Sequence, residues 1–463
     1  MRKIAVSIIA LLVSSMTLMA GRVSREDAAL VANHFMSVAA PAADGVQRVA
    51  PAVRMVLKES SEQTESQYYV YENENGEGWV IIAANDAVSP ILAYSETGHF
   101  RTENMPSNIR HWMGNYDKFI KRIETDGVEA AEETKAEWKA LRKGVRKAKA
   151  AVVVGPLIQT KWDQDKPYNK LCPGTGTNKA YTGCVATAMA QVMKYWEWPV
   201  NGTGSHSYRP LDVNEPYDFW GNPNYSTRYP DTVSADFGNT VYAWENMQAS
   251  YEGLTPSYQQ NAVATLMFHC GVATEMMYGN DADGGSGTFT LNNDEWDTHD
   301  NAQNAFFRFF KYKKPTGYMR DGLKYGGYTY YKKWSDADWT AMVKEELDKQ
   351  HPILYGGASD EGGHSFICDG YDNQDYFHFN WGWSGDNDGY FTLSRLRPGS
   401  GGAGGGGYDF SEDQDVLIGI EPDWAQAIET VKSDESVQKT IVDGRVVIVR
   451  DNIMYDLMGQ KIQ

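Results

Sequence analysis

Cys184 stands directly after Gly183 and opens a stretch, residues 184–196, in which apolar residues recur at the spacing of one helix face. These apolar residues are Val185, Ala188, Met189, Val192 and Trp196. A cysteine in the first turn of a helix meets unpaired N–H groups and the positive end of the helix dipole, which favour the nucleophilic thiolate. Taken alone, the position favours an ordinary half-buried cysteine.

The ends and the polar face of this helix can also be read from the sequence. Thr182 can cap the first turn, and Pro199 stops the helix. Thr187, Gln191 and Lys194 fall on the face opposite the apolar one. The pattern predicts a helix with one buried face and Cys184 at its start.

A nucleophilic cysteine needs a base and a group that orients the base, and residues 352–383 offer both. His364 begins a strand after a glycine-rich turn, and Gly363 leaves its imidazole sterically open. The chain then turns and returns, so an antiparallel hairpin would bring Asn380 past His364. Asn380 would orient the imidazole, and Trp381 or Trp383 would shield that contact from water. A lone histidine at a strand start is usually structural, but one in this setting is much less so.

The composition describes an ordinary globular protein of two or three folded units. The chain has 463 residues, of which 42% are apolar and 22% are charged. Its net charge of −18 argues against nucleic acid or an anionic membrane as the main partner. The aromatic content of 13% fits clefts or glycan-binding surfaces, but aromatic β-structure explains it more simply.

The N-terminus has the pattern of a secretory signal peptide. Arg2 and Lys3 precede an apolar stretch, and small residues around Ala20 predict cleavage there. A membrane anchor is the weaker reading, because serine and threonine dilute a barely sufficient length. We expect an exported protein without stable membrane insertion.

The four cysteines do not imply a complete disulfide framework, because a free nucleophile would leave three. They are Cys172, Cys184, Cys270 and Cys368. No Cys/His cluster has the spacing of a structural zinc site, and Ser384–Phe391 fits a tight turn better than a calcium loop. We expect neither a metal nor a cofactor.

An α+β unit precedes the chemistry-bearing segments. Residues 23–39 predict an amphipathic helix that starts at Ser24, residues 67–86 predict strands, and residues 105–123 predict a helix capped by Ser107. The charged, alanine-rich stretch 132–150 should bury little and form an exposed basic linker.

A second unit extends from about Val152 to about Asp423. Inside it, Gly279–Asp300 is acidic and predicts a surface insertion, and the glycine run Pro398–Gly407 predicts a flexible loop. The last forty residues carry a short strand pattern, and they are too few to fold alone.

Four segments resemble the signature segments of the streptopain family, secreted bacterial cysteine peptidases with a papain-like fold. They are KWDQDKPYN, YTGCVATAMAQVMKYW, GGHSFICDGYD and HFNWGWSGDNDGYF, in the family's order. The resemblance covers Pro156 to about Pro422. It aligns Gln164 with the family's oxyanion-hole glutamine. The N-terminal stretch GWVIIAANDAVSPILAYSETGHF is similar to the family's inhibitory propeptide.

The resemblance implies an α+β fold in which a small α+β prodomain precedes a two-lobed papain-like domain. The domains would be a signal peptide (1–20), a propeptide (21–150), a peptidase domain (151–422) and a tail (423–463) that resembles the end of a sorting module.

The resemblance also assigns roles. Cys184 would attack the scissile carbonyl, His364 would transfer protons, Asn380 would orient His364, and Gln164 would help to stabilise the oxyanion. The partners would be peptide substrates and the chain's own propeptide, released by a cut in the basic linker.

Two other classes of function stay open. A non-proteolytic adhesin or glycan-binding protein on a peptidase-derived fold would have no chemical need for Cys184, His364, Asn380 and Gln164 together. Another acyl-transfer enzyme, such as a transglutaminase-like protein, can share Cys-His chemistry but lacks support from the surrounding segments.

Overall fold

A computed structural model gives the fold in two large units and a small C-terminal sheet. It describes residues 21–37, 53–56, 66–74, 76–103, 105, 107–145, 150–253, 255–291, 300–325, 328–359, 362–393, 414–426, 437–442, 445–450, 453–455 and 462. The predicted signal peptide and the glycine run 398–407 lie outside these residues. None of the helices in the described ranges is long and apolar enough to cross a membrane.

The N-terminal unit (residues 21–145) contains the predicted helices and strands. Its elements are α1 (Arg25–Met36), β1 (Val53–Met55), β2 (Tyr68–Asn73), β3 (Trp79–Ala83), β4 (Ile91–Ser95), α2 (Ser107–Thr125) and α3 (Glu132–Arg142). The predicted start of α1 is confirmed, because the Ser24 side chain accepts a hydrogen bond from the backbone N–H of Asp27. Helix α2 begins at Ser107 itself, so this serine is the first helical residue rather than the cap.

The second unit (residues 150–426) holds the remaining helices and most of the strands. Its helices are α4 (Cys184–Trp196), α5 (Ser257–Ala273), α6 (Ala302–Phe309) and α7 (Asp336–Asp348), with short 3-10 turns at Gly176–Asn178, Trp244–Asn246 and Asp281–Asp283. Its strands are β5 (Val152–Val154), β6 (Ser205–Tyr208), β7 (Val233–Asp236), β8 (Thr316–Met319), β9 (Leu323–Tyr325), β10 (Tyr328–Tyr331), β11 (Ile353–Ser359), β12 (Gly362–Asp372), β13 (Tyr376–Asn380), β14 (Gly389–Thr392) and β15 (Gln414–Ile418).

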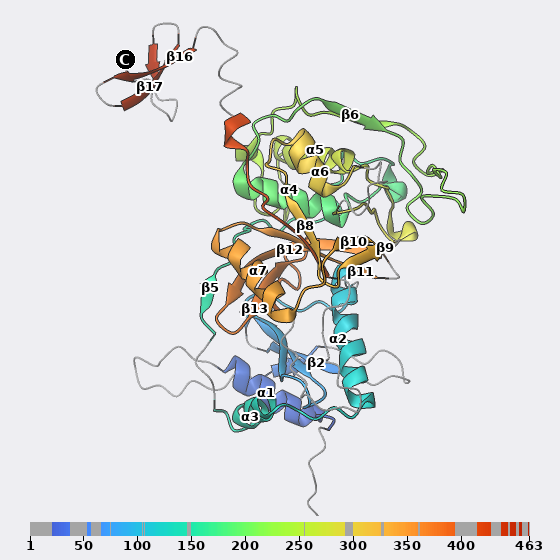
Figure 1. Ribbon diagram of the computed structural model, residues 1–463, viewed down its shortest axis with the longest axis vertical. Coiled ribbons are helices and arrows are strands. Elements are labelled where there is room, and N and C mark those ends of the chain that lie inside the picture. The colour runs from blue at the N-terminus through green and yellow to red at the C-terminus, as the bar shows by residue number, and fades with distance from the viewer. Residues whose placement is uncertain are drawn as a thin grey trace, which may run out of the picture.

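One antiparallel sheet runs through both units (Figure 1). Its strand order is β1-β2-β3-β4-β14-β13-β12-β11-β15-β8, with β5 beside β12. The smaller pairs β6–β7 and β9–β10 lie apart from it. The sequence predicts strands that form a small sheet in the N-terminal unit, and the structure joins these strands to the strands of the second unit through the pair β4–β14.

The junction of the two units is the pair β4–β14. Tyr94 lies opposite Tyr390, and their rings stack with centroids 5.3 Å apart. The Tyr94 hydroxyl also donates a 2.7 Å hydrogen bond to Oδ2 of buried Asp372, at the end of β12. Because this bond ends on a carboxylate, it is of the stronger, charge-assisted kind.

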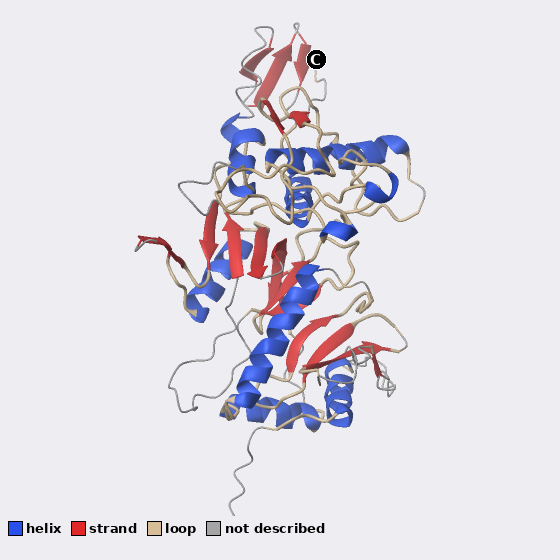
Figure 2. Cartoon of the chain, turned by 90° about the vertical axis from the view of Figure 1, so that its right-hand side faces the viewer, coloured by secondary structure: helices blue, strands red, loops and turns tan. Residues whose placement is uncertain are grey.

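Helix α2 reinforces the junction by running from the N-terminal unit to the strands of the second unit (Figure 2). Its buried Trp112 packs edge-on against four aromatic rings of those strands and of the turn after β13. The four are Tyr355, Phe366, Phe379 and Trp381, at centroid distances of 5.1–6.3 Å. These aromatic residues pack in and beside β-strands, in agreement with the prediction that the aromatic content reflects aromatic β-structure.

The two faces of the sheet serve two different cores. Tyr355 and Phe366 point into the core shared with the N-terminal unit and α7, whereas Leu354 and Ile367 point into the core formed with α4, α5 and α6. The second unit therefore consists of a helical lobe and a sheet lobe. This arrangement confirms the predicted α+β, two-lobed fold.

The predicted exposed linker is wrong for its first half. Residues 132–142 form helix α3, in which Trp138 is only 1% exposed and donates a hydrogen bond to the backbone oxygen of Val88. Arg142 pairs with Asp27 at 2.6 Å and thereby ties α3 to α1. Because Trp138 and Leu141 recur at helix spacing within the charged run, the segment has one face to bury.

The C-terminal tail forms a three-stranded antiparallel sheet that stands apart from the second unit in Figure 1. Its strands are β16 (Val437–Val442), β17 (Arg445–Arg450) and β18 (Ile453–Tyr455). The predicted strand at GRVVIVRDN is confirmed as β17. The proposed likeness to a sorting module stays a prediction.

We predict that Trp112→Ala destabilises the full-length protein in a Cys184→Ala background, which is expected to prevent self-cleavage. Loss of a buried tryptophan typically costs about 3–5 kcal/mol of unfolding free energy, measurable by denaturant unfolding followed by circular dichroism. Trp220→Ala is the matched control, because Trp220 is 81% exposed. Equal effects of the two substitutions would contradict the role given to Trp112.

Candidate active site

Cys184 is the first residue of α4, as predicted. The residue before it, Gly183, has a φ of +87°, and a Cβ atom there would lie 2.7 Å from the Met276 side chain. Glycine is therefore required for both conformation and space. The predicted Thr182 cap is wrong, since the helix has no side-chain cap and the Thr182 hydroxyl bonds the Thr187 hydroxyl at 2.9 Å.

The Cys184 sulfur lies against strand β12. The backbone N–H of Ser365 donates to Sγ of Cys184 over 3.4 Å. Burial raises the pKa of the Cys184 thiol, while N–H groups of Ser365, Val185 and Cys184 itself act in the lowering direction. Burial is the largest of these influences, so the net shift of the Cys184 pKa is upward.

His364 directly precedes Ser365 in β12 and pairs with Gly357 of β11. His364 is therefore the neighbour in the strand of the residue whose N–H contacts the Cys184 sulfur. The predicted hairpin with β13 is confirmed, and its ladder ends at the pair Ile367–Asn380. The side chain of His364 lies outside the described part of the chain, so its contacts with Cys184 and Asn380 stay predictions.

The Asn380 amide is buried and bonded to three groups. Its Nδ2 donates to the backbone oxygen of Thr160 over 2.9 Å. Its Oδ1 accepts from Nε2 of Gln191 at 3.0 Å and from the N–H of Gly382 at 3.1 Å. These bonds fix the amide plane and leave one N–H of Nδ2 for a further acceptor.

Gln164 lies beside the chain segment that leads into Cys184. Its backbone oxygen accepts from the N–H of Thr182 over 3.1 Å, and the residue is only 5% exposed. Its own N–H donates to Oδ1 of Asp163 at 2.5 Å. The structure therefore brings Gln164, Cys184, Asn380 and the strand of His364 together around the start of α4.

Gln191 joins these segments, although the sequence gives it no role. Its Oε1 accepts from Oγ1 of Thr160 at 2.7 Å, while its Nε2 donates to Asn380. The residue is 1% exposed, like Thr187, so the face opposite the apolar one is also buried. The sequence could have indicated a role for Gln191, because the spacing of three and four residues from Cys184 through Thr187 to Gln191 places all three on one helix face.

The predicted cleft residues occupy different environments. Trp381 is 1% exposed, and its backbone oxygen accepts a 3.0 Å hydrogen bond from Nδ2 of Asn108 in α2. Trp383 is partly buried at the edge of the same core. Gly363 pairs with Ala358 between β12 and β11. The N-terminal unit therefore reaches the turn that follows Asn380.

The predicted surface insertion partly supports the site. Oγ of Ser286 donates to the backbone oxygen of Tyr181 at 2.8 Å, and the Tyr181 N–H donates to the oxygen of Gly279. Oγ1 of Thr290 lies 2.5 Å from Oγ of Ser365. The first half of this stretch is thus a wall beside Cys184, and residues 292–299 lie outside the described ranges.

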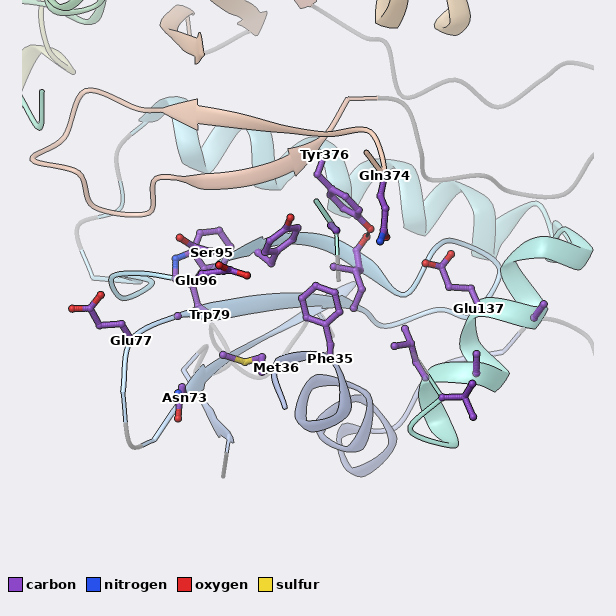
Figure 3. A pocket seen from close by; sticks show the side chains of 18 of the residues that line it. Phe35, Met36, Asn73, Glu77, Trp79, Ser95, Glu96, Glu137, Gln374 and Tyr376 are labelled. Carbon is purple, nitrogen blue, oxygen red and sulfur yellow. Dashed lines mark hydrogen bonds between the residues drawn. The ribbon is translucent and has the colours of Figure 1, made fainter. Parts of the chain in front are cut away.

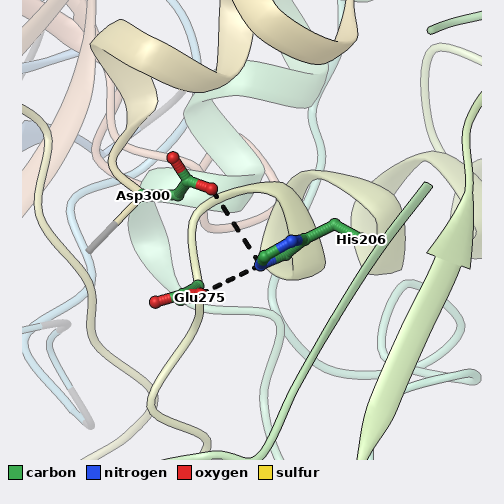
Figure 4. Close-up of side chains that lie close together, drawn as sticks. All are labelled: His206, Glu275 and Asp300. Carbon is green, nitrogen blue, oxygen red and sulfur yellow. Dashed lines mark hydrogen bonds and ion pairs between the residues drawn. The ribbon is translucent and has the colours of Figure 1, made fainter. Parts of the chain in front are cut away.

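A cluster of His206, Glu275 and Asp300 lies in the helical lobe (Figure 4). Within the described ranges it is the one set of three His, Cys, Asp or Glu groups close enough to share a metal ion. Nε2 of His206 lies 2.9 Å from Glu275 and 3.9 Å from Asp300, and Arg308 also pairs with Asp300. Each group of the cluster thus has a polar partner within it or in Arg308.

A pocket of about 670 Å³ opens where the N-terminal unit meets the loop before β13 (Figure 3). Phe35, Met36 and Trp79 line it from the N-terminal unit, and Gln374 and Tyr376 line it from the second unit. None of the predicted site residues borders it. This pocket therefore belongs to the junction of the units and not to the chemistry at Cys184.

Comparisons with known proteins match both units. A model of the peptidase C10 family matches residues 162–391, and a model of the Spi protease inhibitor matches residues 20–120. Streptopain of Streptococcus pyogenes serotype M1 is 30% identical over 370 residues, which are 77% of this chain and 81% of streptopain.

Two further relatives agree. The thiol protease/hemagglutinin PrtT of Porphyromonas gingivalis is 31% identical over 91% of this chain, which spans only 44% of PrtT. The structure of a prointerpain A fragment from Prevotella intermedia is 31% identical, with a TM-score of 0.58 over 81% of this chain and 100% of the fragment.

Fold, site and comparisons together define a cysteine peptidase that is made as a zymogen with an N-terminal inhibitory prosegment. Within that class, the chain belongs to the peptidase C10 family, the family of streptopain. The N-terminal unit is accordingly called the prosegment below.

We predict that Gln191→Ala lowers kcat/KM of the processed enzyme about 10- to 100-fold, because buried hydrogen-bonding groups of Asn380 and Thr160 lose their partner. Hydrolysis of a peptide substrate measures the loss. Gln159→Ala is the control, since this glutamine is exposed and bonds only the nearby Pro156 oxygen among the described residues. An unchanged kcat/KM for Gln191→Ala would show that the bridge does not position the site.

Proposed function

We propose that Cys184 is the nucleophile of an exported cysteine endopeptidase and that His364 is its proton-transfer partner. The observation that carries this proposal is the contact between the Ser365 N–H and the Cys184 sulfur. It joins the start of α4 to the strand residue that follows His364. In the reaction, the thiolate attacks the scissile carbonyl and His364 protonates the leaving amine. His364 then activates the water that hydrolyses the thioester.

The oxyanion would be stabilised by the Cys184 N–H and the Gln164 side-chain amide. The first N–H of a helix has no partner inside the helix, which leaves it free for a substrate oxygen. No residue in the described ranges forms a hydrogen bond with the side-chain amide of Gln164. One donor of this kind typically contributes about 3 kcal/mol of transition-state stabilisation.

Asn380 would hold the imidazole of His364 through its remaining N–H. Gln191, Thr160 and Gly382 supply the other bonds of the amide and would keep that N–H pointing in one direction. The buried Trp381 next to it would exclude water from the contact, and Trp383 and Gly363 would border the cleft.

Release of the prosegment would need a cut after α3. Since Lys139 and Arg142 lie in that docked helix, we place the cut between Lys143 and Val154 rather than further upstream. The residues Lys143, Gly144 and Val145 are exposed, and residues 146–149 lie outside the described ranges. The N-terminal signal pattern supports export of the precursor before this cut.

Cys184→Ala tests the proposal. We expect loss of peptide hydrolysis and accumulation of the full exported precursor, because both reactions need the thiol. The measurements are cleavage of a denatured protein and the size of the accumulated chain. Cys172→Ala is the control, since Cys172 is a buried free cysteine whose pKa burial raises to about 12.

More than a trace of thiol-dependent hydrolysis by pure Cys184→Ala protein would contradict the assignment. Loss of hydrolysis in the Cys172→Ala control as well would show that the cysteines matter for folding rather than for the reaction.

A further inference from the structure

Asp415 lies on the same face of the sheet as the contact with the Cys184 sulfur. In β15 it is paired opposite Gly356 of β11, and Gly356 is paired opposite Ser365 of β12. Ser365 is the residue whose N–H contacts Sγ of Cys184. A row of three adjacent strands, about 4.8 Å apart, therefore leads from the nucleophile to Asp415.

The neighbours of Asp415 along the strands identify the face on which it lies. Side chains alternate along a strand, so Asp415 shares its face with Leu417. Leu417 packs in the core of α4 together with Leu354 and Ile367, which are the neighbours of Gly356 and Ser365 on that face. The Asp415 side chain thus lies on the side of the sheet that carries Cys184.

The absent side chain of Gly356 lets the carboxylate lean toward the nucleophile. A Cβ atom on Gly356 would lie 2.7 Å from Oδ1 of Asp415 and 3.1 Å from Oδ2. The carboxylate therefore covers the glycine and lies one strand closer to Ser365 than its own backbone does. Its charge is one of the influences that raise the pKa of the Cys184 thiol.

The carboxylate has an unfilled bonding position. Oδ1 of Asp415 is shielded from solvent and has no hydrogen-bond partner among the described residues. Burial raises the pKa of this carboxyl group to about 7. The Asp415 residue as a whole is partly exposed. A shielded carboxylate oxygen without a partner is costly, and such groups gather at functional sites. A positively charged group of a bound ligand would give Oδ1 of Asp415 a partner.

We propose that Asp415 is a specificity-determining residue that binds a lysine or arginine side chain of the substrate. This inference rests on the proposed function. An extended peptide advances about 3.3 Å per residue, and a lysine or arginine side chain adds its own length. The basic residue would therefore lie within two positions of the scissile bond. An arginine can satisfy the carboxylate with two parallel hydrogen bonds.

The test compares matched peptides cleaved by the processed wild-type and Asp415→Asn enzymes. The peptides differ only in having arginine or leucine at each of the two positions on either side of the cut. We expect the wild type to prefer arginine at one position. In Asp415→Asn, the ratio of kcat/KM for that peptide to kcat/KM for the matched leucine peptide falls about 10- to 100-fold.

Asp415→Ser is the second variant, for the case in which the Asp415→Asn protein does not fold. Its small hydroxyl side chain also removes the charge. A cooperative unfolding transition followed by circular dichroism checks that each variant is folded. A wild type without preference for arginine at all four positions, or a preference that survives both substitutions, overturns the inference. Absence of hydrolysis of every peptide, with arginine as well as with leucine, by the wild type would instead overturn the proposed function.

Discussion

The pairing of β4 with β14 is the interaction on which the rest of the structure depends. It makes the prosegment part of the sheet whose next strands carry Asn380, His364 and Asp415. Tyr94 secures the junction twice, by stacking on Tyr390 and by its bond to Asp372. Because the sheet is continuous, the prosegment is held in one orientation relative to the site.

Covalent linkage adds to this docking. A linker between the two units keeps the prosegment at roughly millimolar effective concentration, so modest contacts suffice to keep it in place. Those contacts include Asn108 with the Trp381 backbone and Arg101 with Asp386 at 2.7 Å. Trp381 and Asp386 both lie in the turn that follows Asn380.

Some local features were predictable from the sequence, whereas the caps at Ser107 and Thr182 and the helix α3 were predicted wrongly. Long-range pairings were not predictable. The start of α1 at Ser24, the cysteine at the start of α4 and the hairpin of His364 depend on neighbouring residues, and all three were predicted. The pairing of Tyr94 with Tyr390 joins segments far apart in the chain, and no local pattern sets its register. Gln191 and Asp415 were missed for a related reason, since their importance comes from partners on other strands.

Activity before and after loss of the prosegment tests the central claim most directly. Freshly purified wild-type precursor is assayed with a small peptide over time, and its N-terminus is sequenced at each point. The account predicts a lag, with hydrolysis rising only as a new N-terminus between Lys143 and Val154 appears. If the protein with residues 23–150 still attached hydrolyses the peptide as fast as the trimmed form, the account of a sheet-docked inhibitory prosegment is wrong.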